Sequence, residues 1–121
     1  MDRKLVEVHR SRSALHEQAA SAALQQPQTR EWSIVIHFYS ALHLVEAFLR
    51  AKGENIGAED HGTRWRLIRQ NRELSEGRGQ QFRTAYKRLW DSSSQVRYDP
   101  WFVAREQDIE SLAPKVDRLL Q

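Results

Sequence analysis

The chain has 121 residues, a formal net charge of +3 and no cysteine. This length suits one domain, and the lack of cysteine excludes disulfide bonds and thiolate metal sites. The N-terminus has no apolar segment of the kind found in signal peptides, so a cytoplasmic protein is expected. Helix-forming residues dominate and no segment alternates apolar and polar residues, which predicts an all-α, up-and-down helical bundle of four to five helices over residues 1–121.

The first predicted helix runs from an Asp2 cap to about Gln25. Its apolar residues recur at helical spacing and are expected to face the core: Leu5, Val8, Leu15, Ala19 and Ala22. Arg12 lies in the gap of this stripe. His9 and His16 are seven residues apart and are expected to face solvent.

The longest apolar run, residues 31–53, predicts the central helix. The run is apolar nearly all round, which is typical of a buried helix. Four polar side chains interrupt it: His37, Tyr39, His43 and Glu46. Because a membrane span needs ~20 apolar residues, no span is expected. Thr29 is predicted to cap this helix and Gly53 to end it.

The positive charge concentrates in residues 61–88, which carry eight Lys or Arg against two Asp or Glu. A third helix is predicted from His61, capped by Asp60, and the run SEGRGQ at 75–80 is predicted to be a turn or hinge. Such a segment suits RNA or DNA, although clustered Arg is often a solvated face. The residues expected to contact phosphates are Arg66, Arg69, Arg83, Lys87 and Arg88.

A fourth amphipathic helix is predicted to bury one stripe: Phe82, Ala85, Tyr86, Leu89, Ser93 and Val96. It should close on Arg97 and Tyr98, because Pro100 disfavours helix at the residue before it. Trp101 and Phe102 either fix the last helix to the bundle or form a partner-binding patch.

The tail has apolar residues at helical spacing that predict a last helix: Ile109, Leu112, Val116 and Leu119. Pro114 interrupts this pattern, so a kink or restart is expected there, with Ser111 as the cap of a restarted helix.

No glycine-rich phosphate loop, nucleotide-binding fingerprint, serine elbow or HExxH motif occurs, so no cofactor or metal is expected. Four polar residues remain as candidate catalytic groups, expected to converge at one end of the bundle: His43, His61, Arg64 and Arg97. Tyr39 and Tyr98 are expected to bind substrate beside them. Cleaving a phosphodiester through its 2′-hydroxyl needs a base and a cation, which His and Arg supply without a metal. Alternatively, His43 is a hydrogen-bonded core histidine and Arg97 an ion-paired helix end.

Several motifs form a pattern over about residues 30–99: Trp32, Phe38-Tyr39, Ala41-Leu42-His43, Glu46-Ala47, His61-Gly62-x-Arg64, Tyr86-x-x-Leu89 and Val96-Arg97-Tyr98. This pattern resembles small bacterial proteins of the HEPN superfamily. The resemblance implies a helical bundle that dimerises and a role as a ribonuclease in toxin–antitoxin, CRISPR or other antiphage systems, often beside a nucleotidyltransferase.

The nuclease signature of that family is an Arg followed, after four to six residues, by a His. Arg97 matches the Arg, but residues 102–104 contain no His. The chain therefore either lacks the usual chemistry or draws its imidazole from His61 or His43.

The leading hypothesis is a HEPN-type protein of a toxin–antitoxin or antiphage defence module that binds RNA or nucleotide through the third and fourth helices. If this protein is catalytic, the expected activity is that of a metal-independent endoribonuclease. The alternatives are a non-catalytic HEPN subunit that binds a nucleotidyltransferase or larger effector, and a purely structural helical scaffold. A homodimer is expected through the edge formed by Arg97, Trp101 and Phe102, and no membrane contact is expected.

Overall fold

The computed structural model describes residues 2–54, 61–74 and 76–104, which contain four α-helices and no strand within these ranges. The helices are α1 (Arg3–Leu24), α2 (Trp32–Ala51), α3 (His61–Gln70) and α4 (Arg78–Tyr98). The predicted all-α class and helical bundle are therefore confirmed for this part of the chain. The predictions for Asp60 and for the tail from Ile109 to Leu119 lie outside the described residues.

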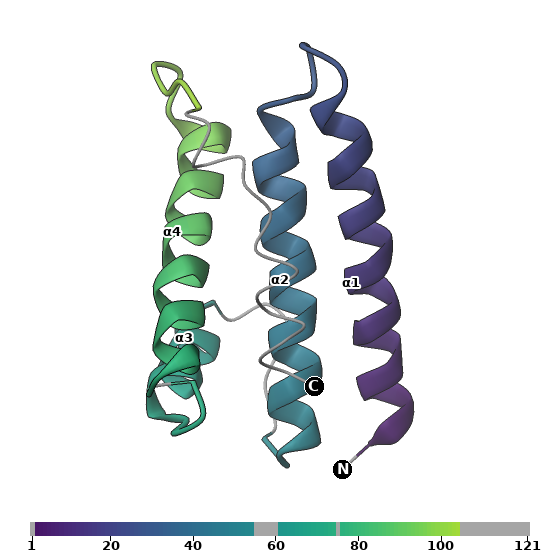
Figure 1. Ribbon diagram of the computed structural model, residues 1–121, viewed down its shortest axis with the longest axis vertical. Coiled ribbons are helices and arrows are strands. Elements are labelled where there is room, and N and C mark those ends of the chain that lie inside the picture. The colour runs from purple at the N-terminus through teal and green to yellow at the C-terminus, as the bar shows by residue number, and fades with distance from the viewer. Residues whose placement is uncertain (1, 55–60, 75, 105–121) are drawn as a thin grey trace.

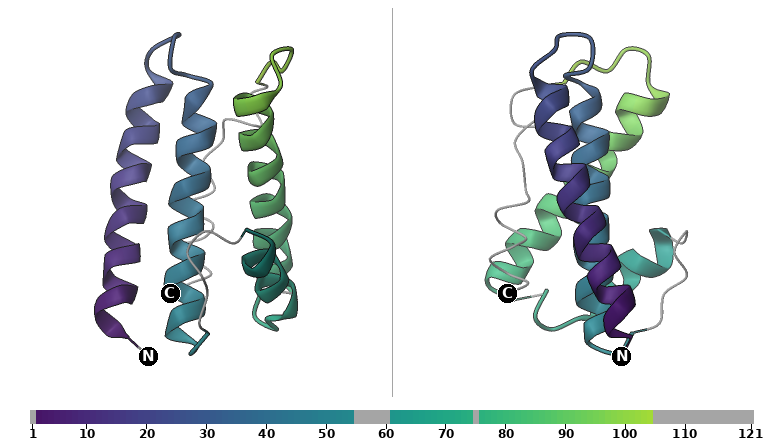
Figure 2. Two further views of the ribbon diagram at one scale, coloured as in Figure 1. Left: turned by 180° about the vertical axis from the view of Figure 1, so that it is seen from behind. Right: turned by 90° about the vertical axis from the view of Figure 1, so that its right-hand side faces the viewer.

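The three long helices lie side by side with α2 in the middle, and consecutive long helices alternate in direction (Figure 1). The right-hand view in Figure 2 shows that α4 crosses the α1–α2 pair at an angle. In the same view, α3 and the C-terminal end of α4 lie on one side of that pair.

The apolar core lies between α2 and α4, with contributions from α3 and the segment after it. Its buried members are Ile34, Phe38, Ala41, Leu42, Val45, Phe48, Leu49, Ile68, Leu74, Phe82, Tyr86 and Leu89. None of these described core residues belongs to α1, which packs along α2 instead. The first helix is therefore held by a separate interface.

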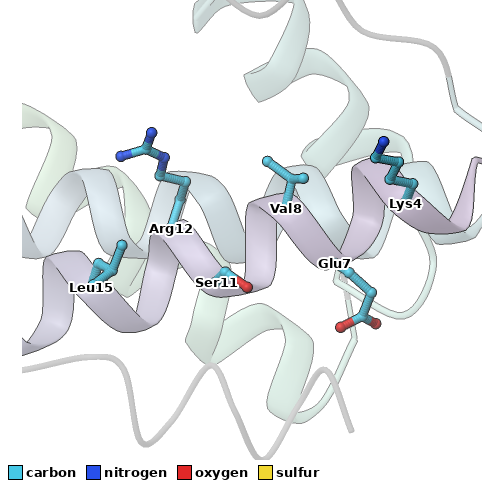
Figure 3. Close-up of a pocket in the computed structure, with 6 residues that line it drawn as sticks. All are labelled: Lys4, Glu7, Val8, Ser11, Arg12 and Leu15. Atoms are coloured by element: carbon cyan, nitrogen blue, oxygen red, sulfur yellow. The ribbon is translucent and has the colours of Figure 1, made fainter.

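That interface buries a different face of α1 from the one predicted. Its buried residues are Val6, His9, Ser13 and Ala20. Val8 and Leu15, expected in the core, are 46% and 56% exposed, and Figure 3 shows both on the outer side of α1 with Arg12 between them. The prediction failed because α2 presents polar partners: the Ser13 and Ser40 hydroxyl oxygens lie 3.1 Å apart, and the Ser40 hydroxyl donates to the Ser13 carbonyl at 3.0 Å.

Three helix ends lie where the sequence predicts them. Asp2 caps α1 by accepting a hydrogen bond from the Leu5 amide at 3.1 Å. Gly53 ends α2 with a φ of 91°, a conformation that costs glycine little. Asp99 is extended before Pro100, which ends α4 at Tyr98 as predicted.

Two predicted boundaries are wrong. Thr29 does not cap α2, because its hydroxyl donates to the Ala23 carbonyl at 2.8 Å inside the α1–α2 turn. Helix α4 starts at Arg78, within the run expected to be a turn. Gly77 lies directly before the helix with a φ of 57°, a conformation that favours glycine. Gly79 is helical and packs so closely that an added Cβ would lie 1.8 Å from the Glu73 carbonyl oxygen.

Helix α2 is long and apolar enough to cross a membrane by length and hydropathy alone, contrary to the expectation from its polar residues. However, 72% of its most apolar 18-residue window is buried within the bundle. The core helix of a soluble protein has the same properties, so this single helix is weak evidence for a membrane span.

Candidate functional site

A line of polar side chains runs along one side of α2: Tyr39, His43, Glu46 and Arg50. They follow one another at four, three and four residues, so they share a helix face. The other three helices supply partners to this line, and the contacts form two neighbouring groups.

The first group is the histidine cluster, which consists of His9, His16 and His43. The Nδ1 atoms of His9 and His43 lie 2.9 Å apart. The His16 ring stacks on His43 with centroids 5.4 Å apart and an interplanar angle of 13°. Because one Nδ1 must donate and the other accept, the His9–His43 contact excludes a proton on both atoms.

Sequence reasoning placed His9 and His16 in solvent, and this was wrong. His9 is only 9% exposed, and His16 is partly buried. A usable signal existed, because His9, Ser13, His16 and Ala20 form a polar and small stripe at helical spacing. Such a stripe complements a partner helix that carries serine and histidine.

Arg97 reaches this group from α4. Its Nη1 donates to the Tyr39 hydroxyl at 3.4 Å, its Nε donates to the Ser93 carbonyl at 3.2 Å, and its guanidinium lies 5.2 Å from the centre of the Tyr98 ring. Tyr39 in turn faces His16, with ring centroids 6.4 Å apart. We call His9, His16, His43, Tyr39 and Arg97 together the imidazole–arginine site.

Burial keeps the imidazoles of this site neutral. Desolvation lowers the pKa of His9, His16 and His43, and for His43, the neighbouring His9, His16 and Arg12 lower the pKa further, to about 4. Arg12 also lowers the pKa of His16, so this α1 residue acts on the site although sequence reasoning gave it no role. Neutral imidazoles are the form that accepts a proton.

The second group is a buried ion pair that joins α2 to α3. Arg64 Nη2 lies 2.8 Å from Glu46 Oε1, and the two side chains are 0% and 1% exposed. Arg50 Nε binds the other Glu46 oxygen at 3.0 Å. Arg64 also contacts Tyr86, whose pKa is raised by burial, and the hydrogen bond from Arg64 partly opposes this rise. A fully buried Arg with these partners favours an anchoring role over contact with substrate.

His61 belongs to this second group. Its Nδ1 lies 3.1 Å from Arg64 Nη1, and its ring contacts those of Phe38 and Trp90 at 5.8 and 5.6 Å. Arg97 is seven residues beyond Trp90 on α4, or about 10 Å along the helix. The expected single cluster of four catalytic residues is therefore two adjacent groups: His43 is linked to Arg97 through His16 and Tyr39, and His61 contacts Arg64.

The basic residues expected to bind phosphate differ in their exposure to solvent. Arg66, Arg69 and Arg88 are exposed, whereas Arg83 and Lys87 are partly buried. Lys87 pairs with Asp91 at 2.6 Å and lies 4.9 Å from the centre of the Trp90 ring. Tyr98 is 77% exposed. The exposed basic residues of the set on α3 and α4 are therefore Arg66, Arg69 and Arg88.

Within the described ranges, no group of three or more His, Asp or Glu side chains is arranged to hold a metal ion. Comparison with protein-family models, with curated proteins and with solved structures finds no match to this chain. The function is therefore inferred from the imidazole–arginine site.

Proposed function

We propose that the chain is a cytoplasmic HEPN-type protein of a bacterial toxin–antitoxin or antiphage defence module, and that it binds RNA and cleaves it without a metal ion at the imidazole–arginine site. One observation carries the proposal: the His43 ring contacts His9, which is buried, and His16, and His16 faces the Tyr39 ring, whose hydroxyl accepts a hydrogen bond from Arg97. His43 and its α1 partners supply the imidazole that the sequence after Arg97 lacks.

The His9–His43 pair suits transfer of an RNA phosphoryl group to its own 2′-hydroxyl. A neutral imidazole of the pair accepts the 2′-hydroxyl proton while O2′ bonds to phosphorus, and it becomes an imidazolium. The bond from phosphorus to O5′ breaks, and the protonated imidazole gives its proton to O5′. The products are a 2′,3′-cyclic phosphate and a 5′-hydroxyl. Arg97 neutralises charge that develops on the non-bridging oxygens.

The exposed arginines of α3 and α4 support RNA as the ligand. Arg66, Arg69 and Arg88 attract phosphates without reading base sequence. Their contribution is electrostatic, and it concentrates RNA near the bundle while the imidazole–arginine site performs the chemistry.

The proposal is tested by incubating the purified protein with total tRNA and a panel of synthetic RNAs. Arg97→Ala and His43→Asn should each reduce cleavage by about 10²-fold or more, because each removes one catalytic group. Arg10→Ala is the matched control, since Arg10 is exposed on α1 and forms an exposed ion pair with Glu7 at 3.7 Å. Equal cleavage by all three variants would refute the site.

A second candidate function is a non-catalytic subunit that binds a nucleotidyltransferase or larger effector. Exposed apolar side chains favour it, because Trp101 and Val103 are 88% and 80% exposed. Phe102 packs against the core, whereas Trp101 is exposed, and the last helix that the two residues were expected to fix lies outside the described residues. The same edge is the proposed homodimer interface, and a monomeric mass in light scattering at tens of micromolar protein would contradict it.

A further inference from the structure

The histidine cluster has an unusual charge environment. Arg12 lies one helical turn before His16 on α1 and lowers the pKa of His16 and His43, while Arg97 of α4 donates a hydrogen bond to Tyr39, which faces His16. Among the described residues, the His43 ring contacts those of His9 and His16, His16 also faces the Tyr39 ring, and no hydrogen bond or ion pair joins the three imidazoles to a carboxylate. Three imidazoles and two guanidinium groups therefore lie together without a paired anion.

One carboxylate, Glu46 on α2, acts on the cluster from a distance and raises the pKa of His9 and His43. Both of its oxygens are already bound, one by Arg50 of α2 and one by Arg64 of α3. These two arginines also lower the pKa of His9. Glu46 is therefore already paired with two arginines, which offset its effect on the histidine cluster.

In the protein without a bound anion, each proton added to the histidine cluster places a positive charge beside the other imidazoles and Arg12. Burial opposes that charge as well, so the free cluster stays neutral. An anion placed between the rings and the guanidinium groups reverses the balance, since it stabilises each imidazolium that forms. Anion binding and proton uptake must then be linked, and each strengthens the other.

We propose that the histidine cluster, with Arg12 and Arg97, is a proton-linked phosphate site that takes up protons when it binds the phosphate group of RNA and binds it more tightly as the solution becomes more acid. This inference rests on the proposed function and adds the group recognised and its regulation. A phosphate fits because its several oxygens accept hydrogen bonds from imidazolium and guanidinium donors at once.

The test is isothermal titration calorimetry with a short single-stranded RNA and with inorganic sulfate, between about pH 8 and pH 6. Neither probe changes its own charge in this range, so any proton uptake belongs to the protein. Repeating each titration in buffers of different ionisation enthalpy counts the protons. Affinity should rise by up to about tenfold per pH unit for each proton taken up. Affinity independent of pH, with no proton uptake, would overturn the inference.

Nuclear magnetic resonance of the histidine rings assigns the protons. Sulfate should raise the pKa of His9, His16 and His43, while His61, which is paired with Arg64, should change less. A rise confined to His61 would place the anion elsewhere and contradict the inference.

Arg12→Ala provides a variant that folds, because Arg12 is exposed on α1. It should weaken sulfate binding several-fold and raise the pKa of His16 and His43 in the free protein, since a neighbouring positive charge is removed. Arg10→Ala, on another side of α1, should do neither. Identical effects of the two variants would show a general loss of charge and overturn the site.

The results separate this inference from the proposed function. RNA cleavage at the imidazole–arginine site with an affinity independent of pH would refute the proton link and leave the function standing. Proton-linked binding of sulfate without binding of RNA would support the anion site and identify free phosphate as its ligand, against the proposed function.

Discussion

Replacing Glu46 with Leu should destabilise the protein severely. Glu46 is the shared partner of Arg50 and Arg64, and the Arg64 side chain is 0% exposed. Removal of the carboxylate leaves the Arg64 guanidinium buried without its counter-ion, and water cannot screen it. Breaking a buried pair in this way costs about 3–5 kcal/mol.

The second change, Arg64→Met, should restore most of that loss in the double variant. Apolar residues of similar volume replace a buried ion pair at little cost, and sometimes with a gain of about 1–4 kcal/mol. Urea unfolding followed by circular dichroism gives the free energy of unfolding of the wild type, both single variants and the double variant.

The outcome distinguishes an anchor from a catalytic group. If Glu46 and Arg64 join α2 to α3, the double variant is more stable than either single variant. A loss below about 1 kcal/mol for Glu46→Leu, or a double variant that loses the sum of the two single changes, would refute the reasoning.

Four further predictions follow from the same contacts. RNA affinity should fall steeply with salt, and Arg66→Glu with Arg69→Glu should weaken it without unfolding the domain; salt-independent affinity would exclude the basic surface. The free energy of unfolding should fall as the pH drops from ~6.5 toward 4, because burial lowers the pKa of four histidines: His9, His16, His37 and His43. The unfolded chain then binds more protons than the folded chain, and acid favours unfolding. A melting temperature that does not change over this range would contradict the prediction. Gly79→Ala should lower the melting temperature, since the added Cβ would overlap the Glu73 carbonyl oxygen. An unchanged melting temperature would show that the backbone at Glu73 moves aside at no cost. Cleavage should persist in EDTA, and a loss restored by added metal would point to another mechanism.

The elements that the sequence predicted well depend on local chemistry. Because α2 is apolar on nearly all of its faces, the sequence predicts that it is buried, whichever helices pack against it. Asp2, Gly53 and Pro100 fix helix ends through their own backbone preferences or nearby amides. These features need no knowledge of the tertiary fold.

The orientation of α1 could not be predicted in the same way. Its apolar stripe indicated a buried face, but the face that fits α2 is the one whose Ser13 and His9 meet Ser40 and His43. The choice depends on hydrogen-bond partners 27 and 34 residues away. Two polar stripes that match each other were the available signal.

The candidate site shows the same limit. His43 and Arg97 were identified from residue type and position, yet their link passes through Tyr39, 58 residues before Arg97 in the chain. Arg64 looked equally suitable for catalysis, because the sequence does not reveal that Glu46 holds it in the interior. Charge and spacing in the sequence identify residues that could react. Only the packing in the structure shows which of them are accessible and which, like Arg64, are buried in an ion pair that joins two helices.

The most direct test of the proposed activity uses an RNA with a single 2′-deoxynucleotide, incubated with the protein in EDTA and analysed by mass spectrometry. We expect cleavage at ribonucleotides with 2′,3′-cyclic phosphate ends, none on the 3′ side of the deoxynucleotide, and none by Arg97→Ala. No cleavage by the wild type, or cleavage that ignores both the missing 2′-hydroxyl and the missing arginine, would contradict the imidazole–arginine site as a ribonuclease centre.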